Sequence, residues 1–196
     1  MPNALRKQYR ALLEAPEILV MPGVFDGFST AIVEKLGFKA GFVSGAGISE
    51  SALGLADMGV MGLEDNLARA RALADISTIP LQADADTGYG NAVNVYHTVR
   101  AFEKAGLSGV MIEDQVWPKR CGHLAGKNVI PFDEAVAEAL QRLLHAPDVY
   151  KVVADSDNHA RSARPSVAPP RASSIAARIL RILPSSPMKI ASPIRK

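Results

Sequence analysis

The chain of 196 residues contains a single cysteine, which excludes an intramolecular disulfide and favours a reducing compartment. Aromatic residues make up only 6% of the sequence, and no apolar run approaches the roughly 20 residues that cross a bilayer. The first seven residues lead into a charged amphipathic stretch rather than the apolar core of a signal peptide. We therefore expect a cytoplasmic protein without a membrane partner.

A second set of absences divides the chain into two parts. Residues 155–196 lack glycine, glutamate and aromatic residues, whereas all 15 glycines lie between Gly23 and Gly126. The same segment holds six of the 13 prolines, and eight Lys or Arg against two Asp. We predict a catalytic domain over 1–154 and an irregular basic, Pro/Ser/Arg-rich tail over 155–196, either in a non-native reading frame or disordered. Scattered charges without interleaved aromatics argue against nucleic-acid binding.

Strand-like and helix-like segments alternate along the first 154 residues. The predicted strands are Ile18–Met21, Ala40–Ser44, Ile79–Asp84, Gly109–Glu113 and Val149–Ala154. The predicted helices are Ala4–Glu14, Asp26–Leu36, Leu63–Ile76, Asn91–Ala105 and Phe132–His145. Short apolar strands separated by helices of about ten to fifteen residues predict parallel βα units. We expect an α/β fold of the (β/α)8 TIM-barrel type, truncated after about five units.

Acidic residues gather where the predicted strands end. Asp84 and Asp86 lie two residues apart on an extended segment, so their side chains point the same way and can face one hard cation. Glu113, at the end of the next strand, would supply a third oxygen ligand or hold a metal-bound water. Alternatively, the two aspartates cap the following turn and helix. We favour a site for Mg²⁺ or Mn²⁺, because Glu113 and Cys121 follow.

The only cysteine, Cys121, lies in the polar run Pro118–His123. A lone cysteine is more often a small buried hydrophobe. Here its neighbours are Arg120 and Gly122, which suit a loop, and nearby cations favour the thiolate form. We therefore interpret Cys121 as a thiol that transfers protons.

A glycine-containing turn follows the second predicted strand. Backbone N–H groups at such a turn bind a carboxylate or phosphate, especially at the start of a helix. The segment Ser44–Ala46 is therefore either an anion-binding cradle or simply a tight turn between strand and helix.

Taken in order, these motifs resemble the isocitrate lyase/phosphoenolpyruvate mutase superfamily over about 21–154. The run from Lys119 to His123 is similar to the branch that contains methylisocitrate lyase and 2,3-dimethylmalate lyase. The segments that carry the resemblance are Pro22–Asp26, Ser44–Gly47, Leu53–Asp57, Asp84–Gly88, Ile112–Gln115 and Lys119–His123.

The resemblance implies a Mg²⁺-dependent carbon–carbon lyase that cleaves a 2-hydroxy di- or tricarboxylate by retro-aldol chemistry. It implies Cys121 as general acid, tuned by Lys119, Arg120 and His123. A small-molecule carboxylate would be the substrate, and a homotetramer the expected assembly. The remaining residues to which it assigns a role are the metal-binding Asp84, Asp86 and Glu113 and the substrate-binding Ser44, Gly45, Ala46, Asp57 and Gly122.

Two positions depart from the family pattern. Phe42 stands where methylisocitrate lyase has a tyrosine, which points toward the dimethylmalate lyase or mutase side. After the fifth predicted strand, Asp155–Asn158 replaces an Arg-Thr-Asp that binds a substrate carboxylate in the family. The alternatives to a lyase are therefore a phosphonomutase-type isomerase acting on a carboxyphosphonoenolpyruvate-like substrate, and an inactive truncated fragment.

Overall fold

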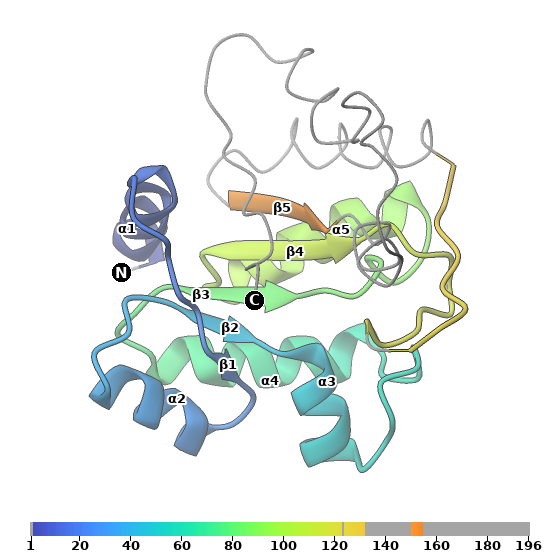
Figure 1. Cartoon of the computed structure of the whole chain (residues 1–196), viewed down its shortest axis with the longest axis horizontal. Helices are drawn as coiled ribbons and strands as arrows, with labels where there is room; N and C mark the ends of the chain where they lie inside the picture. The colour runs from blue at the N-terminus through green and yellow to red at the C-terminus, as the bar shows by residue number, and fades with distance from the viewer. Residues whose placement is uncertain (1, 123, 132–149, 155–196) are drawn as a thin grey trace, which may run out of the picture.

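The computed structural model describes residues 2–122, 124–131 and 150–154 and shows an α/β fold with one parallel sheet (Figure 1). Each strand pairs with its neighbour in the chain, in the order expected for consecutive βα units. The strands are β1 (Gly23–Val24), β2 (Gly41–Val43), β3 (Leu81–Asp84), β4 (Gly109–Glu113) and β5 (Tyr150–Ala154). The helices are α1 (Pro2–Glu14), α2 (Gly27–Lys35), α3 (Gly45–Ile48), the π-helical turn η1 (Ser49–Leu53), α4 (Leu63–Ile76) and α5 (Ala92–Lys104).

The helix boundaries follow from capping residues that the sequence displays. Asp26 precedes α2, and its carboxylate accepts a hydrogen bond from Ser29 N at 2.7 Å. Asn91 precedes α5 and accepts from Val93 N at 2.9 Å. These side chains satisfy N–H groups that have no partner within the helix. The predictions of α1, α2, α4, α5, β2, β3 and β4 are confirmed, and those of α4 and β4 with unchanged bounds.

The predicted strand Ile18–Met21 is wrong. This segment links α1 to the sheet without pairing to a strand, and Ile18 is 82% exposed. The first strand lies just beyond it, where Gly23 pairs with Phe42, and Val24 pairs with Val43 and is fully buried. Apolar content alone does not make a strand, because a strand also needs a neighbouring strand to which its backbone can bond.

The sequence analysis also missed α3 and η1, which together span 45–53. The predicted fifth strand begins one residue later, at Tyr150. The predicted helix Phe132–His145 and the tail 155–196 lie outside the described residues.

The core lies between the sheet and its outer helices, and α2, α4 and α5 pack against one another in turn (Figure 1). Leu81 and Ala83 of β3 join Leu67 of α4 and Phe102 of α5 in this core. Since side chains alternate along a strand, Gln82 faces the other side, where it accepts a hydrogen bond from the buried Tyr9 of α1. Within the described ranges, no helix combines the length and apolar character needed to cross a membrane.

The core predicts a contrast between two residues of α5. Phe102 is fully buried, whereas Val93 is 65% exposed. Phe102→Ala should lower the free energy of unfolding by about 3–5 kcal/mol, because it removes an aromatic ring and leaves a cavity. Val93→Ala should change it by less than about 0.5 kcal/mol. Urea unfolding followed by circular dichroism measures both, and equal losses would contradict this packing.

Candidate active site at the carboxyl edge of the sheet

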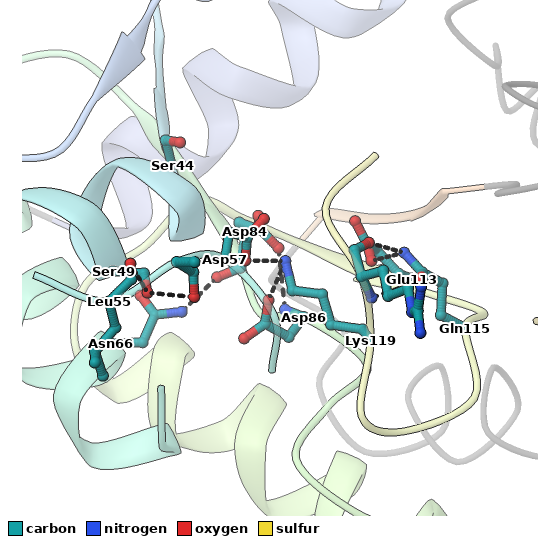
Figure 2. A network of polar contacts seen from close by, with 12 residues as sticks. Ser44, Ser49, Leu55, Asp57, Asn66, Asp84, Asp86, Glu113, Gln115 and Lys119 are labelled. Carbon is teal, nitrogen blue, oxygen red and sulfur yellow. Dashed lines mark hydrogen bonds and ion pairs between the residues drawn. The ribbon is translucent and has the colours of Figure 1, made fainter. Parts of the chain in front are cut away.

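Acidic side chains from separate segments meet around the ammonium group of Lys119 (Figure 2). Lys119 Nζ lies 2.5 Å from Asp57 Oδ1 and 2.9 Å from Asp86 Oδ1. Lys119 is only 2% exposed, and both aspartates are buried. Buried charges are stable only when they are paired. Lys119 is therefore the internal counter-ion of this cluster.

The turn after β3 places Asp84 and Asp86 at this edge. Asp84 Oδ1 accepts a hydrogen bond from Asp86 N at 3.0 Å, and Asp86 O accepts one from Glu113 N at 2.7 Å. Asp86 and Tyr89 have φ angles of 47° and 61°, in the left-handed region that residues other than glycine seldom adopt. Such backbone strain persists where the surrounding structure enforces it, and it clusters at functional sites.

Asn66 and Tyr89 support the turn, and the sequence analysis missed both. Asn66 of α4 is buried and donates from Nδ2 to Asp84 O at 2.8 Å and to the Tyr89 hydroxyl at 2.7 Å. Burial and the charge of Asp86 raise the pKa of Tyr89, so its hydroxyl stays neutral. The available signal was a polar Asn in the interior of a helix, a position that this residue type does not favour.

Gln115 links Glu113 to the loop that carries Cys121, and it was also missed. Its Nε2 donates to Glu113 Oε2 at 2.6 Å and to Arg120 O at 2.9 Å. Its Oε1 accepts from Arg120 N at 3.0 Å. Cys121 is half-buried, and its N–H donates to Asp57 O at 3.1 Å. The loop backbone is thus fixed to the segment that supplies Asp57.

The predicted anion cradle lies beside the acidic cluster. Ser44 Oγ accepts a hydrogen bond from Gly47 N at 3.1 Å and begins α3. A Cβ atom added to Gly45 would lie 2.9 Å from Asp84 Oδ2. A side chain at position 45 would therefore displace the Asp84 carboxylate, and only glycine allows the turn that includes Ala46 to approach it this closely.

Other predicted residues lie apart from these carboxylates. The exposed Arg120 directs its guanidinium along its own loop, where Nη1 donates to Ala125 O at 3.4 Å. Gly122 is exposed, and its carbonyl accepts from Lys127 Nζ at 2.6 Å. His123 lies outside the described residues. The structure therefore unites Asp57, Asp84, Asp86 and Lys119, but it does not bring Arg120 to them.

The electrostatics of the cluster are dominated by burial. Burial and the charge of Asp86 raise the pKa of Asp84 to about 7, although Lys119 opposes the shift. Burial likewise raises the pKa of Asp86 and of Glu113 against the effect of Lys119. Burial lowers the pKa of Lys119, but the charge of Asp86 and hydrogen bonds to Asp57 and Asp86 outweigh it and raise the pKa. Lys119 is thus charged, and one lysine does not neutralise all these carboxylates.

The donor chemistry fits a hard divalent cation. Asp57, Asp84, Asp86 and Glu113 offer carboxylate oxygens, the ligands that Mg²⁺ and Mn²⁺ prefer. Among the residues that the structure describes, no three His, Cys, Asp or Glu side chains converge into a ready metal cage. Mg²⁺ usually takes one or two carboxylates and retains several waters. The site fits this mode of binding rather than an all-protein cage.

Comparison with known proteins decides the family. The family model described as phosphoenolpyruvate phosphomutase matches residues 9–164. The chain belongs to the phosphoenolpyruvate mutase/isocitrate lyase superfamily. Among solved members of the superfamily, oxaloacetate acetylhydrolase bound to 3,3-difluorooxalacetate superposes with a TM-score of 0.74 at 36% identity, over 78% of this chain and 54% of that one.

Other superfamily members carry different activities in their names. The chain is 43% identical to 2,3-dimethylmalate lyase of Eubacterium barkeri, over 66% of this chain and 45% of the relative. It is also 43% identical to a chloroplastic carboxyvinyl-carboxyphosphonate phosphorylmutase of Arabidopsis thaliana, over 82% and 48%. A phosphonopyruvate hydrolase solved with oxalate and Mg²⁺ superposes with a TM-score of 0.67 at 25% identity, over 76% and 51%. The chain spans about half the length of these relatives.

The raised pKa of Asp84 predicts how the stability of this superfamily member depends on pH. In the unfolded chain this carboxyl ionises near 3.8, and in the folded protein near 7. Between these values the unfolded chain binds fewer protons, so stability falls as pH rises. The melting temperature in EDTA should therefore decrease from pH 5 to pH 8. Asp84→Asn should flatten this slope and raise the melting temperature at pH 8. An unchanged slope in the variant would contradict the assignment to Asp84.

Proposed function

We propose that this protein is a Mg²⁺-dependent carbon–carbon lyase that cleaves a 2-hydroxy di- or tricarboxylate by retro-aldol chemistry. The observation that carries the proposal is the buried carboxylate cluster beside the loop of Cys121. Similarity to 2,3-dimethylmalate lyase and to oxaloacetate acetylhydrolase supports it, since both names refer to small dicarboxylates.

In this proposal Asp84 and Asp86 hold the metal directly or through water, with Glu113 beside them. When bound, Mg²⁺ would act as a Lewis acid that polarises the 2-oxy group of the substrate. The Ser44–Ala46 turn would bind a substrate carboxylate through its backbone N–H groups, beside the metal that Asp84 would hold. Asp57 and Gly122 would complete the binding region.

Cys121 is proposed as the general acid. In the cleavage step the substrate hydroxyl passes its proton to a carboxylate of the cluster and becomes a carbonyl, and the adjacent carbon–carbon bond breaks. The bonding electrons stay on the carbon next to a carboxylate, which Cys121 Sγ–H then protonates, leaving a thiolate. The cationic groups of Lys119, Arg120 and His123 would stabilise this thiolate and the substrate charges. Gln115 would keep the Cys121 loop in place, because its side chain bonds both the N–H and the carbonyl of the preceding residue, Arg120.

A phosphonomutase-type isomerase is the second candidate, and one comparison favours it. The match to carboxyvinyl-carboxyphosphonate phosphorylmutase covers 82% of this chain. Phe42, on β2, also lacks the hydroxyl expected for the methylisocitrate lyase branch. Incubation with candidate hydroxy acids and with carboxyphosphonoenolpyruvate separates the two functions, since oxoacid release indicates a lyase and phosphonate formation a mutase.

The assignment of Cys121 predicts the effect of a conservative change. Cys121→Ser should reduce kcat by about 10²–10⁴-fold, because a hydroxyl is a much weaker acid than a thiol. Its melting temperature and Mg²⁺ affinity should match those of wild type. His97→Gln, in the exposed part of α5, serves as control and should retain full activity. Full activity of Cys121→Ser would exclude the thiol as proton donor.

The metal assignment predicts that EDTA abolishes activity and that excess Mg²⁺ restores it. Asp86→Asn should stay inactive at Mg²⁺ concentrations that saturate wild type, because an amide replaces a carboxylate ligand. Asp75→Asn, an exposed change on α4, removes the same charge and should behave like wild type. Calorimetric Mg²⁺ titration and rate measurements on wild type, Asp86→Asn and Asp75→Asn test these expectations. Activity that survives exhaustive EDTA treatment would disprove a metal-dependent reaction.

A further inference from the structure

We infer that Lys119 and a divalent cation compete for the same carboxylates, so that metal binding expels Lys119 and moves the loop that carries Cys121. This inference rests on the proposed metal site. It assigns to Lys119 an exchange function that is distinct from tuning the thiol. The juxtaposition that carries it is the Lys119 ammonium inserted between Asp57 and Asp86 (Figure 2).

The first step is geometric. Lys119 Nζ lies 2.9 Å from Asp86 Oδ1, and a hard cation bound to the same oxygen would lie about 2.0–2.1 Å from it for Mg²⁺. Two positive charges would then share one buried carboxylate oxygen. Like charges at this separation repel strongly in a buried site. A metal bound directly to Asp86 Oδ1 would therefore compete with the ammonium for that oxygen.

The second step concerns the path of the side chain. Lys119 is 2% exposed, so surrounding residues cover its side chain and its ammonium. Its backbone is also tightly packed, since a Cβ added to Gly59 would lie 3.0 Å from Lys119 N. We therefore expect expulsion of the ammonium to move the segment around Lys119 and to open its close contact with Gly59.

The third step links this shift to the reactive thiol. Cys121 follows Lys119 by two residues, and its N–H donates to the backbone carbonyl of Asp57. The side chain of the same Asp57 holds the Lys119 ammonium. Both ends of the Lys119–Cys121 segment thus contact Asp57, while Gln115 holds the Arg120 peptide between them. Loss of the ion pairs of Lys119 would leave Cys121 N–H as the segment's contact with Asp57. Metal binding would in this way set the position of the proton donor.

The principal experiment is calorimetric titration of Mg²⁺ into the full chain and three variants. Lys119→Met removes the competing charge and should bind Mg²⁺ about tenfold more tightly or better. Lys104→Met removes the same charge from an exposed position on α5 and should bind like wild type. Asp86→Asn should lose Mg²⁺ binding. An affinity of Lys119→Met equal to or weaker than that of wild type would overturn the exchange.

A second readout uses wild-type protein and does not depend on any variant folding. Trp117 is the only tryptophan and Cys121 the only cysteine, and they flank Lys119. Trp117 also packs against Tyr89, with ring centroids 6.4 Å apart. Saturating Mg²⁺ should change both the Trp117 emission and the rate of Cys121 alkylation by iodoacetamide, with midpoints that match the calorimetric Kd.

The outcomes separate this inference from the proposed metal site. Mg²⁺ binding that leaves Trp117 emission and Cys121 alkylation unchanged would refute the exchange while the metal site stands. Absence of Mg²⁺ binding in wild type and in Lys119→Met would refute both. Tighter binding by Lys119→Met, with emission and alkylation close to those of Mg²⁺-saturated wild type before metal is added, is the result that supports the exchange.

Discussion

The candidate active site depends on one interaction, the pairing of buried carboxylates with a single buried lysine. Asp84 and Asp86 at the end of β3 meet Asp57 from the loop before α4 around one internal cation, the ammonium of Lys119, which pairs with Asp57 and Asp86. Without such a cation, burial would drive protons onto the carboxylates, and the raised pKa of Asp84 shows this tendency even with Lys119 present. Hydrogen bonds from Asn66 to the Asp84 carbonyl and from Gln115 to the Glu113 carboxylate hold these groups in place against the repulsion between the carboxylates.

The features that could be predicted from sequence are those with local physical causes. Asp26 and Asn91 mark the starts of α2 and α5 because a capping side chain acts within three residues. Asp84 and Asp86 were recognised because spacing of two on an extended segment places side chains on one side. Parallel pairing then brings the ends of β3 and β4 to one edge, which explains why Glu113 was associated with them.

The features that were missed depend on contacts distant in sequence. Ile18–Met21 is apolar enough for a strand, but only the tertiary structure reveals that Gly23 and Val24 hold the pairing position. The position of Asn66 inside a helix is unusual, but its neighbours in sequence do not identify its partner, the Asp84 carbonyl 18 residues away. The pairing of Lys119 with Asp57 and Asp86 also could not be predicted, because the residues next to Lys119 in sequence indicate only a role beside the Cys121 thiol.

The sequential pairing of the strands has a consequence for synthesis of the chain. Each strand bonds the one made just before it, so the sheet can grow in the order in which the ribosome delivers it. The three aspartates emerge well before residue 119, which supplies their counter-ion. During that interval the nascent carboxylates must remain hydrated, so the edge that they occupy cannot reach its buried form before Lys119 has been made.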